Sequence, residues 1–190
     1  SQQGLEVRAN ENDNLIELRA PNTILRAGDG NDYIDIGSSG TSSEIYGDAG
    51  NDTFKLSGSS VEGLEDNDKF FDLRGGSGYD KIQINGDGDL NFTNILNNVN
   101  NITGVEEVFT DTGGESVITL SFSDVIAMTD SDNQFVINAG AQDVVHFDAE
   151  GASQTQSING SYREFSFDNG GNTVTLLVSN DVASGDIYIA

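Results

Sequence analysis

Hydrophobic residues in the first part of the chain recur singly, between polar neighbours and after acidic, glycine-rich turns. The three clearest strand-like triplets are Tyr33-Ile34-Asp35, Thr53-Phe54-Lys55 and Lys81-Ile82-Gln83. Alternation of apolar and polar positions is typical of a β-strand with one buried face. The pattern predicts short strands in which Ile34, Phe54 and Ile82 face a core.

The turns before these strands repeat one motif. They read Ala27-Gly28-Asp29-Gly30-Asn31-Asp32, Gly47-Asp48-Ala49-Gly50-Asn51-Asp52 and Gly75-Gly76-Ser77-Gly78-Tyr79-Asp80. With the strands they fit the pattern G-G-x-G-x-D-x-U-x, where U is a large apolar residue and only the first two positions vary. Glycine permits positive φ, so carbonyl oxygens can point inward, and the sixth-position aspartates add carboxylates there. Such an oxygen-rich turn favours a hard cation, and calcium suits it best.

In these three motifs the chain resembles the calcium-binding repeats-in-toxin (RTX) proteins of Gram-negative bacteria. The resemblance implies a parallel β-roll that binds several Ca²⁺ ions, in a secreted or surface-anchored protein exported by type I secretion. We expect a monomeric module of a longer chain. The turn residues that the motif identifies as calcium ligands are Gly28, Gly30, Asp32, Gly47, Asp48, Ala49, Asp52, Gly76, Gly78 and Asp80.

The expected fold is all-β. A short calcium-bound parallel β-roll or solenoid, residues 1–91, precedes a β-rich C-terminal half, residues 92–190, with one or two short helices. We expect the two parts to pack as one continuous module. The second half also resembles the segment that follows the repeats in large RTX surface proteins, with Gly104-Val105-Glu106 and then Leu120-Ser121-x-x-Asp124-Val125.

The spacing of aspartates predicts one coil per repeat. Asp13, Asp32 and Asp52 follow at intervals of 19 and 20 residues, so Asn12-Asp13-Asn14 is interpreted as a degenerate turn. The interval from Asp52 to Asp80 is 28 residues, and the excess forms an acidic insert near residues 57–73. An insert in a repeat scaffold is either a functional loop or a tolerated one, and the sequence leaves both open. Its further candidate metal ligands are Asp66, Asp68 and Asp72.

A second acidic turn follows the third repeat. Asp87, Asp89 and Asn91 match the first three ligand positions of an EF-hand loop, but Phe92 replaces the required glycine and Asn98 the final glutamate. We therefore exclude an EF-hand and retain Asp87 and Asp89 as calcium ligands. The predicted ligand-binding residues are Asp87, Asp89, Asn91, Asp68 and Tyr79.

The second half is predicted to be mostly strands, with a short helix in residues 94–101 and a helical turn over 123–128 capped by Ser123 or Asp124. Asn169-Gly170-Gly171-Asn172 is a predicted hairpin turn. The predicted strands are 102–109, 117–120, 134–138, 143–147, 163–167, 173–178 and 186–189.

Charge excludes some partners. The chain carries 32 acidic and 8 basic residues, a formal net charge of −24, and after Lys81 the next basic residue is Arg163. Such a chain repels nucleic acid and anionic membranes, and its compact state repels itself unless cations neutralise it. There is no cysteine, so disulfides are excluded. No apolar run approaches the roughly 20 residues of a membrane span, so direct insertion is not expected.

Enzymatic function is not expected. His146 is the single histidine and alternates with apolar neighbours as a strand-face residue, and no Gly-x-Ser-x-Gly elbow occurs. Carboxylate pairs such as Glu106 and Glu107 are expected by chance in so acidic a chain. Two hypotheses remain. The first is an adhesin module that binds a cell-surface peptide or glycan, with calcium structuring the fold and contacting the ligand. The alternative is a purely structural, calcium-triggered folding or spacer module. Few repeats, an insert and a long non-repetitive half favour the first.

Overall fold

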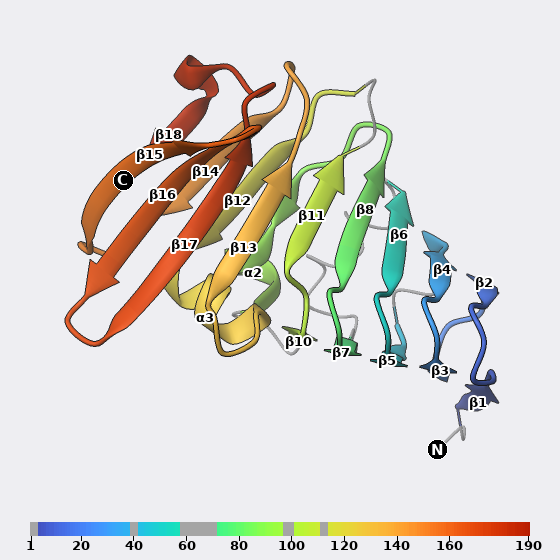
Figure 1. Cartoon of the computed structure of the whole chain (residues 1–190). Coiled ribbons are helices and arrows are strands. Elements are labelled where there is room, and N and C mark those ends of the chain that lie inside the picture. Colours follow the sequence, from blue (N-terminus) through green and yellow to red (C-terminus); the bar gives the residue numbers. More distant parts are fainter. Residues whose placement is uncertain (1–3, 39–41, 58–71, 97–100, 111–113) are drawn as a thin grey trace.

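A computed structural model describes residues 4–38, 42–57, 72–96, 101–110 and 114–190. Strands make up most of this part, and the described helices are α2 (Phe92–Leu96), α3 (Phe122–Met128) and a 3-10 helix (Ser184–Asp186). The predicted β-rich character is therefore confirmed, and Figure 1 shows the strands arranged side by side along the molecule. None of the described helices is long and apolar enough to cross a membrane.

In the first half, successive strands alternate between two parallel sheets. A five-stranded sheet contains, in order, β1 (Leu5–Arg8), β3 (Thr23–Asp29), β5 (Glu44–Ala49), β7 (Asp72–Ser77) and β10 (Asn101–Thr103). A nine-stranded sheet begins with β2 (Leu15–Leu18), β4 (Tyr33–Ile36), β6 (Thr53–Ser57), β8 (Lys81–Asn85) and β11 (Glu107–Thr110). The acidic turns carry the chain from the first sheet to the second.

The register of these strands follows from their apolar residues. Ile34, Phe54, Ile82 and Val108 are direct neighbours across β4, β6, β8 and β11, and all four are fully buried. A one-residue slip would move each of them to the outer face, so the pairing is strongly specified. The predicted core role of the U residues is confirmed.

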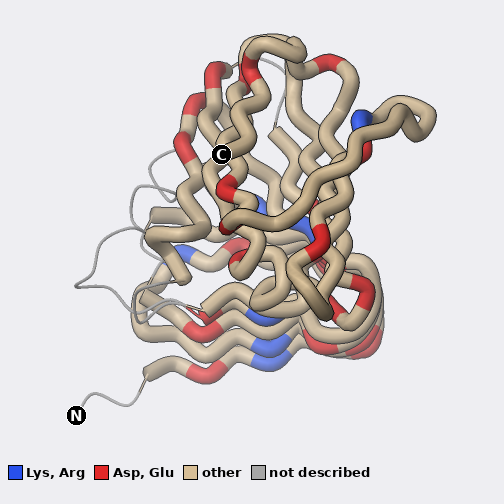
Figure 2. The backbone as a smooth tube through the Cα atoms, turned by 90° about the vertical axis from the view of Figure 1, so that its left-hand side faces the viewer, with Lys and Arg blue, Asp and Glu red and all other residues tan. Residues whose placement is uncertain are grey.

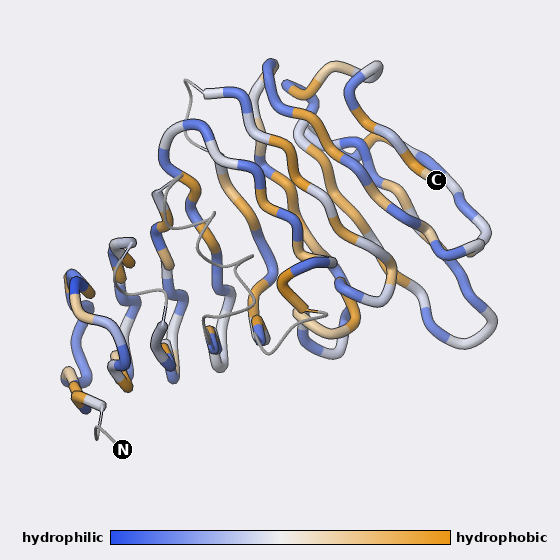
Figure 3. The backbone as a smooth tube through the Cα atoms, turned by 180° about the vertical axis from the view of Figure 1, so that it is seen from behind, coloured by the Kyte–Doolittle hydropathy of each residue, from blue (hydrophilic) through white to orange (hydrophobic). Residues whose placement is uncertain are grey.

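The sheets continue across the predicted boundary at residue 91. β10 pairs with β7 and β11 pairs with β8, both in parallel. The nine-stranded sheet then continues through β13 (Gln134–Asn138), β17 (Asn172–Ser179), β16 (Tyr162–Asn169) and β15 (Ser153–Asn159), the last three pairing antiparallel. A four-stranded parallel sheet is formed by β9 (Leu90–Asn91), β12 (Val117–Ser121), β14 (Val144–Asp148) and β18 (Ile187–Ile189). One connected apolar core therefore spans both halves, and Figure 3 shows its apolar positions running along the strands.

The helices begin earlier than predicted. α2 starts at Phe92, which is buried, rather than at residue 94, and residues 97–100 lie outside the described part. α3 is capped by Ser121, so the predicted cap at Ser123 or Asp124 is wrong. Ser121 accepts from the Asp124 N–H, and Asp124 accepts from the Ser121 N–H, which together form a capping box. Burial of Phe122 in the first helical position accounts for the earlier start.

Two strands differ from the expectation. The single strand predicted over 102–109 is divided by Gly104, whose φ of 61° is left-handed, and its parts enter different sheets. β15 was not predicted, because all seven of its residues are exposed and carry no apolar alternation. The hairpin turn at Asn169–Asn172 is confirmed, since these two residues pair at the end of β16 and β17.

Candidate metal centre

The acidic turns stack directly on one another. Their Asp and Glu residues gather at one edge, at the lower right of Figure 2. The stacking is so close that a Cβ at Gly50 would lie 1.8 Å from the Gly30 carbonyl oxygen, and one at Gly78 would lie 1.9 Å from that of Gly50. Glycine at the fourth motif position is therefore required by the approach of the preceding turn.

Sixth-position carboxylates form a continuous row across the turns. We call Asp32, Asp52, Asp80 and Glu106 the carboxylate row. One oxygen of each accepts the main-chain N–H of the preceding turn. The donors Asn14, Asp32, Asp52 and Asp80 lie at 2.7, 2.8, 2.7 and 2.8 Å from their acceptors. Every member is at most 6% exposed, so the row lies inside the stack.

Among the described residues, the second oxygen of each carboxylate has no hydrogen-bond partner. In the described part, the buried side-chain atoms without a hydrogen bond are the four second oxygens of the row and Nε of Arg163. Leaving a buried polar atom unpaired costs about 1–3 kcal/mol, and more for a charged one. Asp143 is also buried, yet both of its oxygens accept hydrogen bonds from its surroundings. The buried carboxylates of the row therefore lack the positive charge that would balance them.

Carboxylate and carbonyl oxygens lie close together beside the row. A Cβ at Gly47 would fall 2.2 Å from Asp52 Oδ2 and 2.4 Å from the Gly75 carbonyl oxygen. At Gly75 it would fall 2.4 Å from Asp80 Oδ2 and 1.7 Å from the Gly104 carbonyl oxygen. Each glycine thus lies where a carboxylate oxygen and a carbonyl oxygen approach its Cα, with no room for a side chain. This donor set fits calcium, which takes 6–8 oxygen ligands.

Backbone oxygens would have to supply much of the coordination. Among the described residues, no three Asp, Glu, His or Cys side chains converge on one point. The row offers one free carboxylate oxygen per turn, so an ion between two turns needs carbonyl ligands as well. The carbonyl oxygens of Gly75 and Gly104, which lie near Asp52 Oδ2 and Asp80 Oδ2, are the candidates to provide them.

Three members of the row, Asp52, Asp80 and Glu106, have raised pKa values. Burial, followed by repulsion from Asp32 and Asp48, raises the pKa of Asp52 to about 6. Burial and the charges of Asp52 and Glu106 raise the pKa of Asp80 to about 7. The pKa of Glu106 is also raised, mainly by burial. A bound cation would favour the ionised forms and reverse these shifts.

Asn14 closes the N-terminal end of the row. Leu15 pairs with Tyr33, so Asn14 occupies the sixth position of the first turn and the predicted alignment of Asp13 with Asp32 is wrong by one residue. The Asn14 amide nitrogen donates to Asp32 Oδ1 at 3.0 Å, to the Asn10 carbonyl at 3.1 Å and to the Asn12 carbonyl. A side-chain N–H₂ group thus satisfies oxygens of the kind that a cation would satisfy elsewhere.

Asp13 belongs to a second, outer ladder at the fifth position. Its Oδ1 accepts from the Asn31 N–H at 2.7 Å, Asn31 accepts from Asn51 at 2.8 Å, and Asn51 accepts from Tyr79 at 2.7 Å. This ladder joins the turns without using the row. It ends at Tyr79, whose side chain is 40% exposed.

Glu106 was the ligand candidate that sequence reasoning missed. Thr103 pairs with Arg74 and Glu107 with Lys81, so this turn has three residues where the preceding turn has six. The longer Glu side chain therefore reaches a place that Asp occupies elsewhere, and its Oε2 accepts the Asp80 N–H. The Gly104-Val105-Glu106 sequence was the available signal.

Other predicted ligands have different surroundings. Asp48 has a left-handed φ of 74° in its turn and lies 3.5 Å from Arg26, and Asp72 forms a 2.8 Å ion pair with Arg74 on β7. Ala49 pairs with Ser77 in the strand register. Gly28 and Gly76 adopt φ of 111° and 114°. Asp66 and Asp68 lie outside the described residues.

The predicted ligand-binding residues are divided between the two ends of β8. Tyr79 precedes the strand beside the row, whereas Asp87, Asp89 and Asn91 follow it. Asp89 Oδ1 accepts from the Val117 N–H at 2.9 Å, and Asn91 Oδ1 accepts from Asn94 at the start of α2. The structure therefore does not bring Tyr79 together with the second acidic turn.

Comparison with protein-family models, with curated proteins and with solved structures finds no match for this chain.

Proposed function

We propose that this chain is a calcium-stabilised, ligand-binding module of RTX type from a secreted or surface-anchored bacterial adhesin. In this proposal residues 1–91 form a short parallel β-roll, and calcium ions lie along the carboxylate row. The observation that carries it is the line of buried carboxylate oxygens without partners at the sixth motif position. The alternation of strands between two parallel sheets supports the β-roll.

Net charge supports the same proposal. With a formal charge of −24, the compact chain needs counterions, and divalent cations inside the turns neutralise the groups that are least able to reach water. Ions that bind only the folded chain stabilise it by mass action. Calcium at extracellular, millimolar concentration would therefore maintain the fold.

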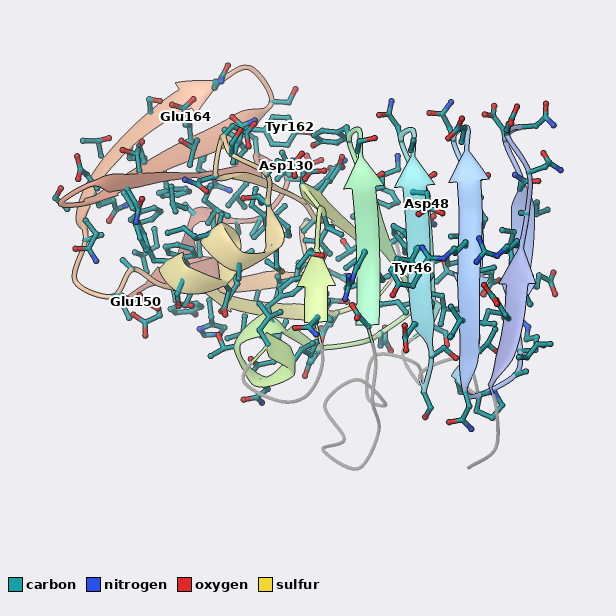
Figure 4. All side chains as sticks on the ribbon, turned by 90° about the horizontal axis from the view of Figure 1, so that it is seen from below. Tyr46, Asp48, Asp130, Glu150, Tyr162 and Glu164 are labelled. Carbon is teal, nitrogen blue, oxygen red and sulfur yellow. The ribbon has the colours of Figure 1, made fainter. Side chains whose placement is uncertain are left out.

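We further propose that a peptide or glycan binds at the end of the row nearest Tyr79. Asp130 and Tyr162 lie close together beside the turn after β7 in Figure 4, and the charge of Asp130 contributes to the raised pKa of Asp80. Burial, and then the neighbouring Glu107, raise the pKa of the Tyr79 hydroxyl. A calcium ion with open coordination positions at this place would accept a carboxylate or sugar hydroxyls. At this end Tyr79 and Asp130 are exposed and Tyr162 is half-exposed, so a ligand could contact all three side chains.

Thermal unfolding with and without calcium tests the first part. We expect a substantially higher melting temperature in millimolar calcium than in chelator, and several bound ions by calorimetry or native mass spectrometry. An identical melting temperature in both conditions would refute the proposal. Magnesium at the same concentration is the control, because it retains its water more strongly.

Peptide and glycan arrays, probed with and without chelator, test the second part. We expect chelator-sensitive binding that the Tyr79→Ala variant loses while retaining its calcium-dependent melting. Calcium-dependent folding with no bound ligand on either array would favour the purely structural module. Binding that persists in chelator would show that the ligand does not bind through the metal.

A further inference from the structure

A pocket lies between the edge strands of two sheets, away from the carboxylate row. β15 is the last strand of the nine-stranded sheet and β18 the last of the four-stranded sheet, and the two lie near each other in Figure 1. A cavity of about 330 Å³ opens between them. Its lining includes Gln154, Gln156, Arg163, Phe165, Ser184 and Ile187. This volume is at the lower end of small-molecule sites, roughly 300–1,000 Å³.

The pocket exists because the core ends at β16. Phe165 and Phe167 on β16 are buried, but the residues paired with them on β15 are Gln156 and Gln154, which are exposed. Glutamine on the inner face of an edge strand leaves the mouth of the two sheets open and lines it with amide groups. An apolar residue at either position would extend the core instead.

Arg163 gives this pocket a positive charge that no described carboxylate neutralises. The four arginines described in the first half each lie within 3.5 Å of an Asp or Glu oxygen. For Arg163, the described contacts are Nη2 donating to the main-chain carbonyls of Ser179 and Val182. In a chain with 32 acidic residues, a cation facing a pocket without an acidic partner is unusual.

One donor of this guanidinium is also unpaired. Arg163 Nε is buried and has no hydrogen-bond partner in the described part. The carbonyl contacts fix the position of Nη2 but leave this N–H unsatisfied, at a cost of about 1–3 kcal/mol. An anion held against the guanidinium would supply the missing negative charge beside this unsatisfied donor.

We propose that this pocket binds a small organic carboxylate. The planar guanidinium matches a carboxylate in geometry, and the Gln amides and the Ser184 hydroxyl can donate further hydrogen bonds. Phe165 and Ile187 provide an apolar wall for the rest of the ligand, which an inorganic anion would leave uncovered. The site shares no residue with the carboxylate row, so it stands whether or not the row binds calcium.

Benzoate is a suitable probe, and benzyl alcohol is its neutral counterpart. We expect benzoate to shift the Arg163 Nε–H resonance in a ¹⁵N–¹H spectrum and to saturate, and benzyl alcohol to bind roughly ten-fold more weakly because charge-assisted hydrogen bonds are the stronger ones. Gln156→Glu places a like charge in the pocket and should weaken benzoate binding by roughly ten-fold. Thr155→Glu adds the same charge on the opposite face of β15 and should change it little.

Three results would overturn the proposal. Equal binding of benzyl alcohol and benzoate would show an apolar crevice without anion recognition. Equal weakening by both glutamate variants would show a long-range charge effect instead of a site. Unchanged benzoate affinity in a folded Arg163→Gln variant would show that the guanidinium does not bind benzoate. If Arg163→Gln does not fold, the Gln156→Glu variant, which changes an exposed residue, tests the same site.

Discussion

Replacing Asp80 by asparagine should stabilise the metal-free protein and destabilise the calcium-bound protein. Asparagine has nearly the same shape, and its carbonyl oxygen can still accept the Asp52 N–H that Asp80 Oδ1 accepts at 2.7 Å. The substitution removes the charge of a fully buried carboxylate whose Oδ2 has no partner. The substitution should therefore raise the melting temperature in chelator and lower it in calcium, and both changes test the role of Asp80 Oδ2.

The magnitude follows from the pKa of Asp80. In the metal-free fold it is raised from 3.8 to about 7, mainly by burial. A raised pKa means that the charged form of Asp80 destabilises the folded state. This free-energy cost is absent below about pH 4 and complete above about pH 7. Three pKa units correspond to about 4 kcal/mol, which is an upper limit for the gain at pH 8. In a chain of this size each kcal/mol changes the melting temperature by roughly 2–4 °C.

In calcium, the same substitution should lower the stability. A neutral amide is a weaker ligand than a carboxylate, so the variant should bind one ion fewer or bind it more weakly. An ion present at 100 times its Kd contributes about 2.7 kcal/mol, and the variant loses this contribution. Its melting temperature in millimolar calcium should therefore fall below that of the unmodified protein.

Calorimetric melts at pH 8 in chelator and in calcium provide the assay, with Asp143→Asn as matched control. Asp143 is 2% exposed, and its oxygens accept from Ser116, Gly140 and Thr110. Its replacement should lower stability equally in both conditions. If Asp80→Asn also lowers the melting temperature in chelator, the reasoning from the unpaired oxygen is wrong.

Three further predictions concern the same row. In chelator, the stability should rise as pH falls from 8 to 5, because Asp80 and Asp52 gain protons near pH 7 and 6, and the stabilisation by calcium should decrease over the same range. A melting temperature in chelator that does not change between pH 8 and 5 would contradict this prediction. Asn14→Asp should add one bound calcium by native mass spectrometry, and Asn31→Asp, equal in charge but outside the row, should add none. Gly47→Ala should lower both the ion count and the calcium-dependent melting temperature, because its Cβ would lie 2.2 Å from Asp52 Oδ2 and displace that oxygen. Unchanged calcium binding would show that Asp52 Oδ2 is not a ligand.

The sequence predicts the repeated turns well because their chemistry is local. Glycine and aspartate at fixed offsets, followed by one large apolar residue, identify the turn, the strand and the buried side chain together. Ile34, Phe54 and Ile82 are each fully buried for this reason. The alignment of the first turn failed by one residue because the sequence offers an aspartate, Asp13, beside the true sixth-position residue, Asn14, and only strand pairing decides between them.

Features that depend on distant segments were not predictable in the same way. Glu106 joins the row only because its turn is three residues shorter than the one beneath it, and that length is visible only from the pairing of β10 and β11. β15 forms by pairing with β16 and contributes nothing apolar to the core. In both cases the partner strand, not the local sequence, determines the structure.

The two ends of the carboxylate row are closed by different chemistry, and this limits its length. At the first turn the Asn14 side-chain nitrogen donates to Asp32 Oδ1 and to two carbonyls, so a cation bound at those oxygens would have to displace Asn14. At the other end a shortened turn replaces Asp by Glu, and the next strand, β13, follows a loop that begins with Thr129 and contains Asp130 and Asp132, whose charges contribute to the raised pKa of Glu106. Among the described residues, the buried carboxylate oxygens without a partner belong to the row itself, from Asp32 to Glu106, at the turns where stacked strands bury them. The number of unpaired oxygens depends on how many turns the sheets stack. The row of unbalanced carboxylates is therefore as long as the stack of turns that buries it.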